Sequence, residues 1–238
     1  MTAREVTVAI DGPAGAGKST VSRRVAEQLG YLLLDTGALY RSIALAAKEA
    51  GVPWDDEARV SAIAQDIARR EAIRLVPAPK DTPERILLDG RDVARLIRTQ
   101  EIADGASKVS ALPAVRAALL ELQRAAARAG GVVLEGRDIG TVVLPNAEAK
   151  FFLTASVEER AGRRYRELIA RGFTPELAEV EREMRERDAR DTERPVAPLR
   201  QAPDAVLVDS TSLSVDQVVN VIVERVRAVR AARVPDQP

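Results

Sequence analysis

A glycine-rich segment near the N-terminus constrains the fold of this chain more than any other feature. It runs from Gly12 to Ser19 and reads GPAGAGKS. The apolar run at 5–10 predicts a buried strand before it, and apolar positions repeating to about Leu29 predict a helix after it. Glycines let a backbone turn tightly around a bound group, with the N–H groups pointing inward. A strand, such a loop and a helix in this order favour βαβ units and a parallel sheet.

The chemistry of this loop follows from its spacing, which fits G-x-x-x-x-G-K-[ST] in full. Lys18 is expected to reach the β- and γ-phosphates of a nucleoside triphosphate, and the Ser19 hydroxyl to hold Mg²⁺. The helix that follows adds its positive dipole end. The residues expected to bind the triphosphate are Gly12, Pro13, Ala14, Gly15, Ala16, Gly17, Lys18, Ser19 and Thr20. The pattern does not say what the triphosphate is used for.

Composition excludes several other chemistries. The 238 residues include no Cys and no His, so thiol nucleophiles, imidazole bases, disulfides and Cys/His zinc sites are ruled out. Thirty-six basic residues balance thirty-six acidic ones, and we therefore expect no nucleic-acid partner. With no apolar leader and no run of 18 apolar residues, we expect no membrane partner and a cytoplasmic location. The chain is further expected to act as a monomer.

The remaining pattern predicts an α/β core interrupted by an insertion. Core strands are predicted at 5–10, 32–34, 132–134, 149–153 and 205–208. Helices are predicted at 17–29, 38–50, 57–70, 114–129, 157–190 (with a break near 172–175) and 215–229. Between them, short strands at 72–76 and 85–88 flank the turn-rich stretch 77–83, which indicates a small separate sheet.

Three further clusters place arginines beside carboxylates and hydroxyls. They are DTGALYR at 35–41, EGRDIGT at 135–141 and RDARDTER at 187–194. The first two follow predicted strands, and ligands of open α/β sheets bind at the carboxyl ends of strands. One nucleotide does not need so many cations, whereas two phosphate-bearing substrates do. Each cluster alone could be a solvated charged surface, the third above all.

These motifs together make the chain resemble the bacterial cytidylate kinase family, from Val6 to about Val226. The resemblance is carried by IDGPAGAGKST, LLLDTGALYR, IRTQEIADGASKVSALPAVRAALL, LEGRDIGTVV and RERDARDTERPVAPL. It implies an α/β P-loop kinase fold in which helices flank a five-stranded parallel sheet. It further implies a core at about 1–60, 111–155 and 195–230, a small mixed α/β monophosphate-binding insertion at about 60–110, and a helical lid at about 155–175.

The resemblance also implies roles for particular residues. CMP would be bound by Thr36, Arg41, Ser107, Arg116, Arg137, Asp138, Arg187, Asp191 and Arg194. Within this set, the cytosine would be read by Ser107, Arg116 and Asp138, and the ribose held by Arg187 and Asp191. Thr36 stands where the family often has Ser, so the hydroxyl is retained.

For the ATP side, the resemblance implies a lid contribution from Arg160, Arg163 and Arg164. Glu135 stands where related kinases often carry Asp, and would order Mg²⁺ through water. The catalytic residues would be Lys18, Arg137 and Arg194.

The implied reaction is the Mg²⁺-dependent transfer of the γ-phosphoryl group of ATP to CMP or dCMP. Such a transfer depends on positioning and charge neutralisation, and the acceptor phosphate is already anionic near neutral pH, so the absence of His is no obstacle. Two alternatives stay open: a kinase of another monophosphate such as UMP, and a nucleotide-sensing protein with little turnover. The guanine-reading motif N-K-x-D and the ABC-type signature LSGGQ are both absent from the sequence.

Overall fold

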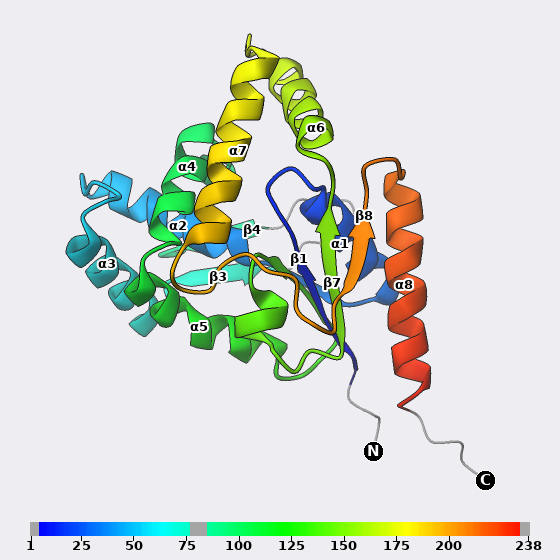
Figure 1. The fold of residues 1–238 in the computed structure, drawn as a ribbon. Helices are drawn as coiled ribbons and strands as arrows, with labels where there is room; N and C mark the ends of the chain where they lie inside the picture. Colours follow the sequence, from blue (N-terminus) through cyan, green and yellow to red (C-terminus); the bar gives the residue numbers. More distant parts are fainter. Residues whose placement is uncertain (1–4, 77–84, 234–238) are drawn as a thin grey trace. The chain divides into compact units, whose positions relative to one another are not determined.

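Figure 1 shows the chain in a computed structural model, which describes residues 5–76 and 85–233. The described residues form two compact units. The first, here called the phosphate-loop unit, comprises the chain up to Leu33 and from Ala129 onwards. The second, called the middle unit, runs from Leu34 to Arg128.

The predicted parallel sheet is confirmed. Within the described residues its strands lie in the order β2-β6-β1-β7-β8. Their bounds are β1 Thr7–Asp11, β2 Leu32–Asp35, β6 Val132–Gly136, β7 Ala149–Thr154 and β8 Val206–Asp209. Because β1 is a central strand, paired in parallel with β6 on one side and β7 on the other, every residue of β1 is buried, including the polar Thr7 and Asp11 at its ends. The chain leaves the phosphate-loop unit within β2.

Two helices cover one face of this sheet. They are α1 (Lys18–Leu29) and α8 (Val215–Ala231), which pack against each other. Val21 and Val25 of α1 join Ile222 and Val226 of α8 in a buried cluster with strand residues such as Ile10. Each pair is four residues apart, which places it on one helical face, and for α1 the sequence predicted this face.

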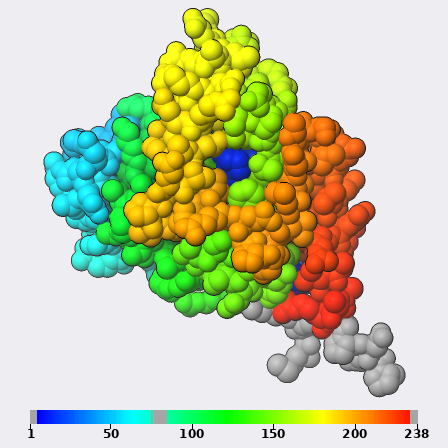
Figure 2. All heavy atoms as spheres, viewed as in Figure 1, coloured from blue at the N-terminus to red at the C-terminus, as the bar shows by residue number. Residues whose placement is uncertain are grey.

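The charged stretch after β7 forms a helical hairpin of α6 (Val157–Ala170) and α7 (Leu177–Glu193), as Figure 1 shows. The predicted break is confirmed: Gly172 has φ +84°, and Pro175 cannot continue the helix before it. In Figure 2, part of the N-terminal segment (blue) is visible in a hollow bordered by the lime and gold segments of this hairpin. A short π-helix, η2 (Ile139–Val143), follows β6 and had no sequence prediction.

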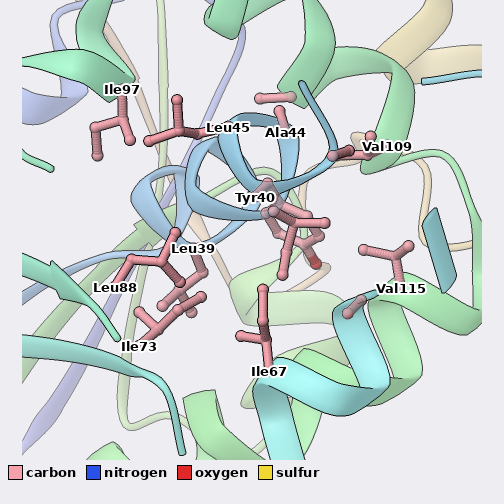
Figure 3. Close-up of a cluster of buried hydrophobic side chains, with 14 of the residues drawn as sticks. Leu39, Tyr40, Ala44, Leu45, Ile67, Ile73, Leu88, Ile97, Val109 and Val115 are labelled. Atoms are coloured by element: carbon pink, nitrogen blue, oxygen red, sulfur yellow. The ribbon is translucent and has the colours of Figure 1, made fainter. Parts of the chain in front are cut away.

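The middle unit is built around α2 (Thr36–Glu49). Its other elements are α3 Glu57–Arg69, β3 Ile73–Val76, β4 Arg85–Leu88, β5 Arg91–Asp92, η1 Leu96–Arg98, α4 Gln100–Val109 and α5 Pro113–Ala127. The expected small sheet is confirmed in the described residues as antiparallel β3-β4-β5, while the turn-rich stretch 77–83 lies outside them. In the core of this unit, Figure 3 shows Leu39 of α2 beside Leu88, and Leu45 of α2 on the side of Ile97.

The helices of residues 5–76 and 85–233 are all too short or too polar to cross a membrane.

Candidate functional site

The loop after β1 has a backbone that requires glycine. A Cβ atom at Gly12 would lie 1.9 Å from the carbonyl oxygen of Leu153, so no side chain fits there. Gly17 takes a left-handed conformation (φ +90°) at the N-cap of α1, where the helix begins with Lys18. The N–H groups of the first turn of α1 therefore open onto the loop, as an anion-binding helix terminus requires.

The surroundings of Lys18 oppose its positive charge. It is buried, and its Nζ donates to the carbonyl oxygen of Pro13 at 2.7 Å. Burial lowers the pKa of its ammonium well below the usual value, and the positive charges of Arg137 and Arg187 lower it further, while Glu135 opposes them. A bound phosphate would raise this pKa again, because a nearby anion favours the charged form.

Two ion pairs join the segment after β6 to the end of α7; Arg137 is partly buried, and the other three side chains are buried. Arg137 Nε donates to Asp191 Oδ2 at 2.7 Å, and Arg194 Nη2 donates to Asp138 Oδ1 at 3.3 Å. Burial opposes ionisation of Asp191, but Arg137 and Arg187 outweigh it and hold the pKa of its carboxyl below the usual value. These pairs bring together residues 54 and 56 positions apart in the chain, and the charges of Arg137 and Asp191 also act on Lys18.

The three arginines expected on the lid are held by protein groups in this structure. Arg160 is buried and bridges both helices to the loop: it donates to the carbonyl oxygens of Ala155 and Ala14, each at 3.0 Å, and pairs with Asp188 of α7 at 2.7 Å. The sequence analysis missed Asp188 as a partner, because the helical charge pattern carries no signal for it.

The other two arginines expected on the lid are less buried than Arg160. Arg163 donates to the hydroxyl and carbonyl oxygens of Ser210 at 3.1 and 2.7 Å, and Arg164 pairs with Glu167 at 2.7 Å. Ser210, which follows β8, was also missed. The ATP contacts expected of all three arginines stay predictions.

Oxygen donors that suit Mg²⁺ lie beside the loop. Ser19 is exposed in the first turn of α1. Glu135 is buried on β6, and its negative charge raises the pKa of Lys18. Hydroxyl and carboxylate oxygens are ligands that Mg²⁺ prefers, usually together with substrate phosphates and water. No group of three or more acidic residues that could hold a metal occurs in the part of the chain that the structure describes. These donors therefore fit a Mg²⁺ ion that arrives with a nucleotide.

The remaining predicted site residues belong to the middle unit. Asp35 caps α2 by accepting from the backbone N–H of Ala38 at 3.2 Å, and its other oxygen pairs with Arg41. Gly37 permits this approach, since a Cβ atom there would lie 2.9 Å from an Arg41 nitrogen.

Three other predicted CMP-binding residues of the middle unit are buried. The guanidinium of Arg116 lies 5.6 Å from the centre of the Tyr40 ring and donates to the carbonyl oxygen of Ser110 at 3.1 Å. Thr36 and Ser107 are buried as well. In this unit, then, Asp35 and Tyr40 hold two of the predicted arginines.

One buried carboxylate next to the loop escaped the sequence analysis. Asp11 ends β1 and is 3% exposed. Burial raises its pKa from 3.8 to about 6, although the hydrogen bonds that it accepts from backbone N–H groups lower it. The sequence did contain a signal for this carboxylate, because a charged residue stands at the end of a strand predicted to be buried.

Comparison with known proteins gives consistent likenesses. The model of the family described as cytidylate kinase matches residues 8–228. The chain is 52% identical over 230 residues to a cytidylate kinase of Syntrophotalea carbinolica, covering 97% of this chain and 94% of that one. It is 49% identical over 221 residues to a cytidylate kinase of Geobacillus kaustophilus, with coverages of 93% and 96%. Among solved structures, a gluconokinase from Sinorhizobium meliloti has a TM-score of 0.46 at 16% identity, covering 98% of this chain and 99% of its own.

Proposed function

This chain belongs to the cytidylate kinase family, and we propose that it transfers the γ-phosphoryl group of ATP to CMP or dCMP, giving ADP and CDP or dCDP. The observation that carries this proposal is the charge arrangement of the phosphate-loop unit. Lys18 is buried, and Arg137 and Arg187 lie close enough to lower its pKa. This concentration of positive charge is unfavourable unless phosphate is bound. ATP and a monophosphate would supply the missing negative charge.

The proposed mechanism uses position and charge, with no general base. Lys18 would neutralise the γ-phosphoryl oxygens, and Arg137 and Arg194 would stabilise the charge that spreads over them during transfer. Both arginines are held by carboxylates, through Asp191 and Asp138, so they need little reorganisation when substrates bind. The acceptor oxygen of CMP is anionic near neutral pH, which makes a base unnecessary.

Mg²⁺ is the proposed cofactor. The Ser19 hydroxyl would hold it, with Glu135 ordering its water ligands. When bound, the ion supplies positive charge to the β- and γ-phosphates, and the protein residues supply the orientation.

The finer substrate contacts are proposed from the family resemblance. Asp138 would read the cytosine amine, and Arg187 and Asp191 would hold the ribose. The CMP-binding roles of Thr36, Arg41, Ser107 and Arg116 stay predictions, as do the ATP contacts of Arg160, Arg163 and Arg164.

The predicted division of the chain also stays a proposal. We keep the insertion at about 60–110 and the lid at about 155–175, noting that the compact middle unit is wider, from Leu34 to Arg128. Arg160 supports a lid function for α6 and α7, because it links both helices to the phosphate loop. We further propose a cytoplasmic monomer without a nucleic-acid partner, acting where ATP and CMP are both present.

An ADP-release assay with a panel of monophosphates tests the proposed function. We expect turnover with CMP and dCMP, turnover with UMP and AMP at least about 100-fold lower in kcat/KM, and almost no ADP release without an acceptor. Equal use of UMP or AMP would indicate a different monophosphate kinase. ADP release near background with every acceptor would indicate a nucleotide-sensing protein.

Replacing Asp191 by alanine tests the ion pairs at the end of α7. The change removes the carboxylate that Arg137 contacts at 2.7 Å and leaves a partly buried cation without it. We expect kcat/KM for CMP and dCMP to fall by roughly 10- to 100-fold, the range for losing a hydrogen bond to a charged group. Steady-state kinetics measures this, with Asp216→Ala as control, because Asp216 forms an exposed pair with Arg24 in the same unit. Unchanged KM and kcat for both substrates would remove Asp191 from the site.

A further inference from the structure

Asp11 is a buried carboxylate that the proposed transfer mechanism does not use. It lies on the central strand β1, opposite Gly136 of β6 and Phe152 of β7, directly before Gly12. Strand pairing on both sides, together with the close approach of Gly12 to Leu153, makes its backbone one of the most constrained in the unit. Its side chain is therefore presented from a rigid position.

The two oxygens of Asp11 bind the start of η2. Oδ1 accepts from the backbone N–H of Ile139 at 2.8 Å, and Oδ2 accepts from that of Gly140 at 2.7 Å. These are the first two N–H groups of the helix, which come directly after Asp138. A Cβ atom at Gly140 would make an ordinary contact with Asp11 Oδ2 at 3.4 Å but a tight one with Lys150 Cδ at 3.2 Å.

This arrangement changes what Asp138 can do. Asp138 stands at the N-cap of η2, where an aspartate usually bonds the first backbone N–H groups of its own helix. In the described residues it makes no such capping bond, and its Oδ1 accepts from Arg194 instead. Asp11, on strand β1, accepts the hydrogen bonds from the first N–H groups of η2. The Asp138 carboxylate is directed toward Arg194 instead.

We propose that Asp11 is a positioning residue for substrate recognition: it anchors the start of η2 and thereby sets the backbone that presents Arg137 and Asp138 to CMP. This inference rests on the proposed function. Only a carboxylate can serve here, since it accepts with both oxygens, whereas an asparagine amide would turn one N–H donor toward a backbone N–H. Burial and the neighbouring Asp138 raise the pKa of this carboxyl, and Lys18 lowers it, so keeping Asp11 ionised costs stability.

The test uses Asp11→Asn in the full-length protein, assayed with CMP, UMP and ATP. We expect KM for CMP to rise and the CMP-to-UMP ratio of kcat/KM to fall, each by roughly 10-fold or more, because small displacements of positioned groups have effects of that size. KM for ATP should stay within about threefold. The control is Glu148→Gln, which removes a carboxylate that accepts from the backbone N–H of Thr7 at the other end of β1.

The possible outcomes separate this role from a structural one. Equal rises in KM for CMP and ATP, or an unchanged CMP-to-UMP ratio in a folded Asp11→Asn protein, would overturn it. If circular dichroism shows that Asp11→Asn is unfolded, Gly140→Ala decides, because its methyl group would lie 3.2 Å from Lys150 Cδ, a tight contact that displaces the start of η2 without changing charge. The same selective loss of CMP use supports the role, and unchanged kinetics refutes it. A parent protein inactive with CMP and dCMP would instead reject the proposed function itself.

Discussion

Replacing Lys18 by alanine is expected to lower kcat/KM for CMP by roughly 10³-fold, the upper range for removing one group that stabilises transition-state charge. The reason lies in the loop geometry, which presents the ammonium from the start of α1 at the point where glycine backbone encloses a phosphate. Most of the loss should appear in kcat, because Lys18 is proposed to act on the γ-phosphoryl group as it moves.

The stability of the Lys18→Ala protein separates a catalytic effect from a folding effect. The folded-state pKa of Lys18 is lowered, so near neutral pH its charged form opposes folding, and removing that charge relieves the cost. We therefore expect the unfolding temperature of the ligand-free variant to be at least that of the parent. Lys48→Ala is the matched control, since Lys48 is exposed and pairs with Glu101, and it should keep kcat/KM within about twofold. Activity of Lys18→Ala within a few-fold of the parent would contradict the assignment of the loop.

The second large effect concerns the base, through Asp138. Cytosine offers an amine donor beside the N3 acceptor, whereas uracil offers a carbonyl acceptor beside an N3–H donor. Asp138 is buried and accepts from Arg194, and a carboxylate has enough lone pairs to accept from the cytosine amine as well. With UMP, the carboxylate oxygen of Asp138 would face the uracil carbonyl oxygen, and neither can donate a hydrogen bond. Sites built on such hydrogen bonds discriminate by up to about 10⁴-fold, and we expect at least 100-fold here.

Two variants of Asp138 test this reading. Asp138→Ala should shrink the CMP-to-UMP ratio of kcat/KM mainly by harming CMP. Asp138→Asn should shrink it further, because its amide can donate to the uracil carbonyl. Competition assays with both monophosphates measure the ratio directly, and Asp204→Asn, which weakens a pair with Lys150 in the same unit, should leave it unchanged. A ratio unaltered in both Asp138 variants would assign base recognition to other residues.

Much of the fold could be predicted because its determinants are local. The buried strands and the break between α6 and α7 were visible in short windows, through apolar runs and the pair Gly172 and Pro175. Helix α4 was not predicted, since Gly105 in its middle disfavours helix. The structure gives the reason for that glycine: a Cβ atom there would lie 2.4 Å from the ring of Trp54, so the residue is set by packing within the middle unit.

The same division applies to the candidate site. The sequence by itself determined the phosphate loop, because eight consecutive residues contain both the glycines that shape the backbone and Lys18 that enters it. Only the tertiary structure decided which charges meet. Arg137 pairs with Asp191, and Asp11 binds N–H groups 128 and 129 residues away. No local pattern encodes such partners, since the distance between side chains far apart in the chain is set by how strands and helices pack.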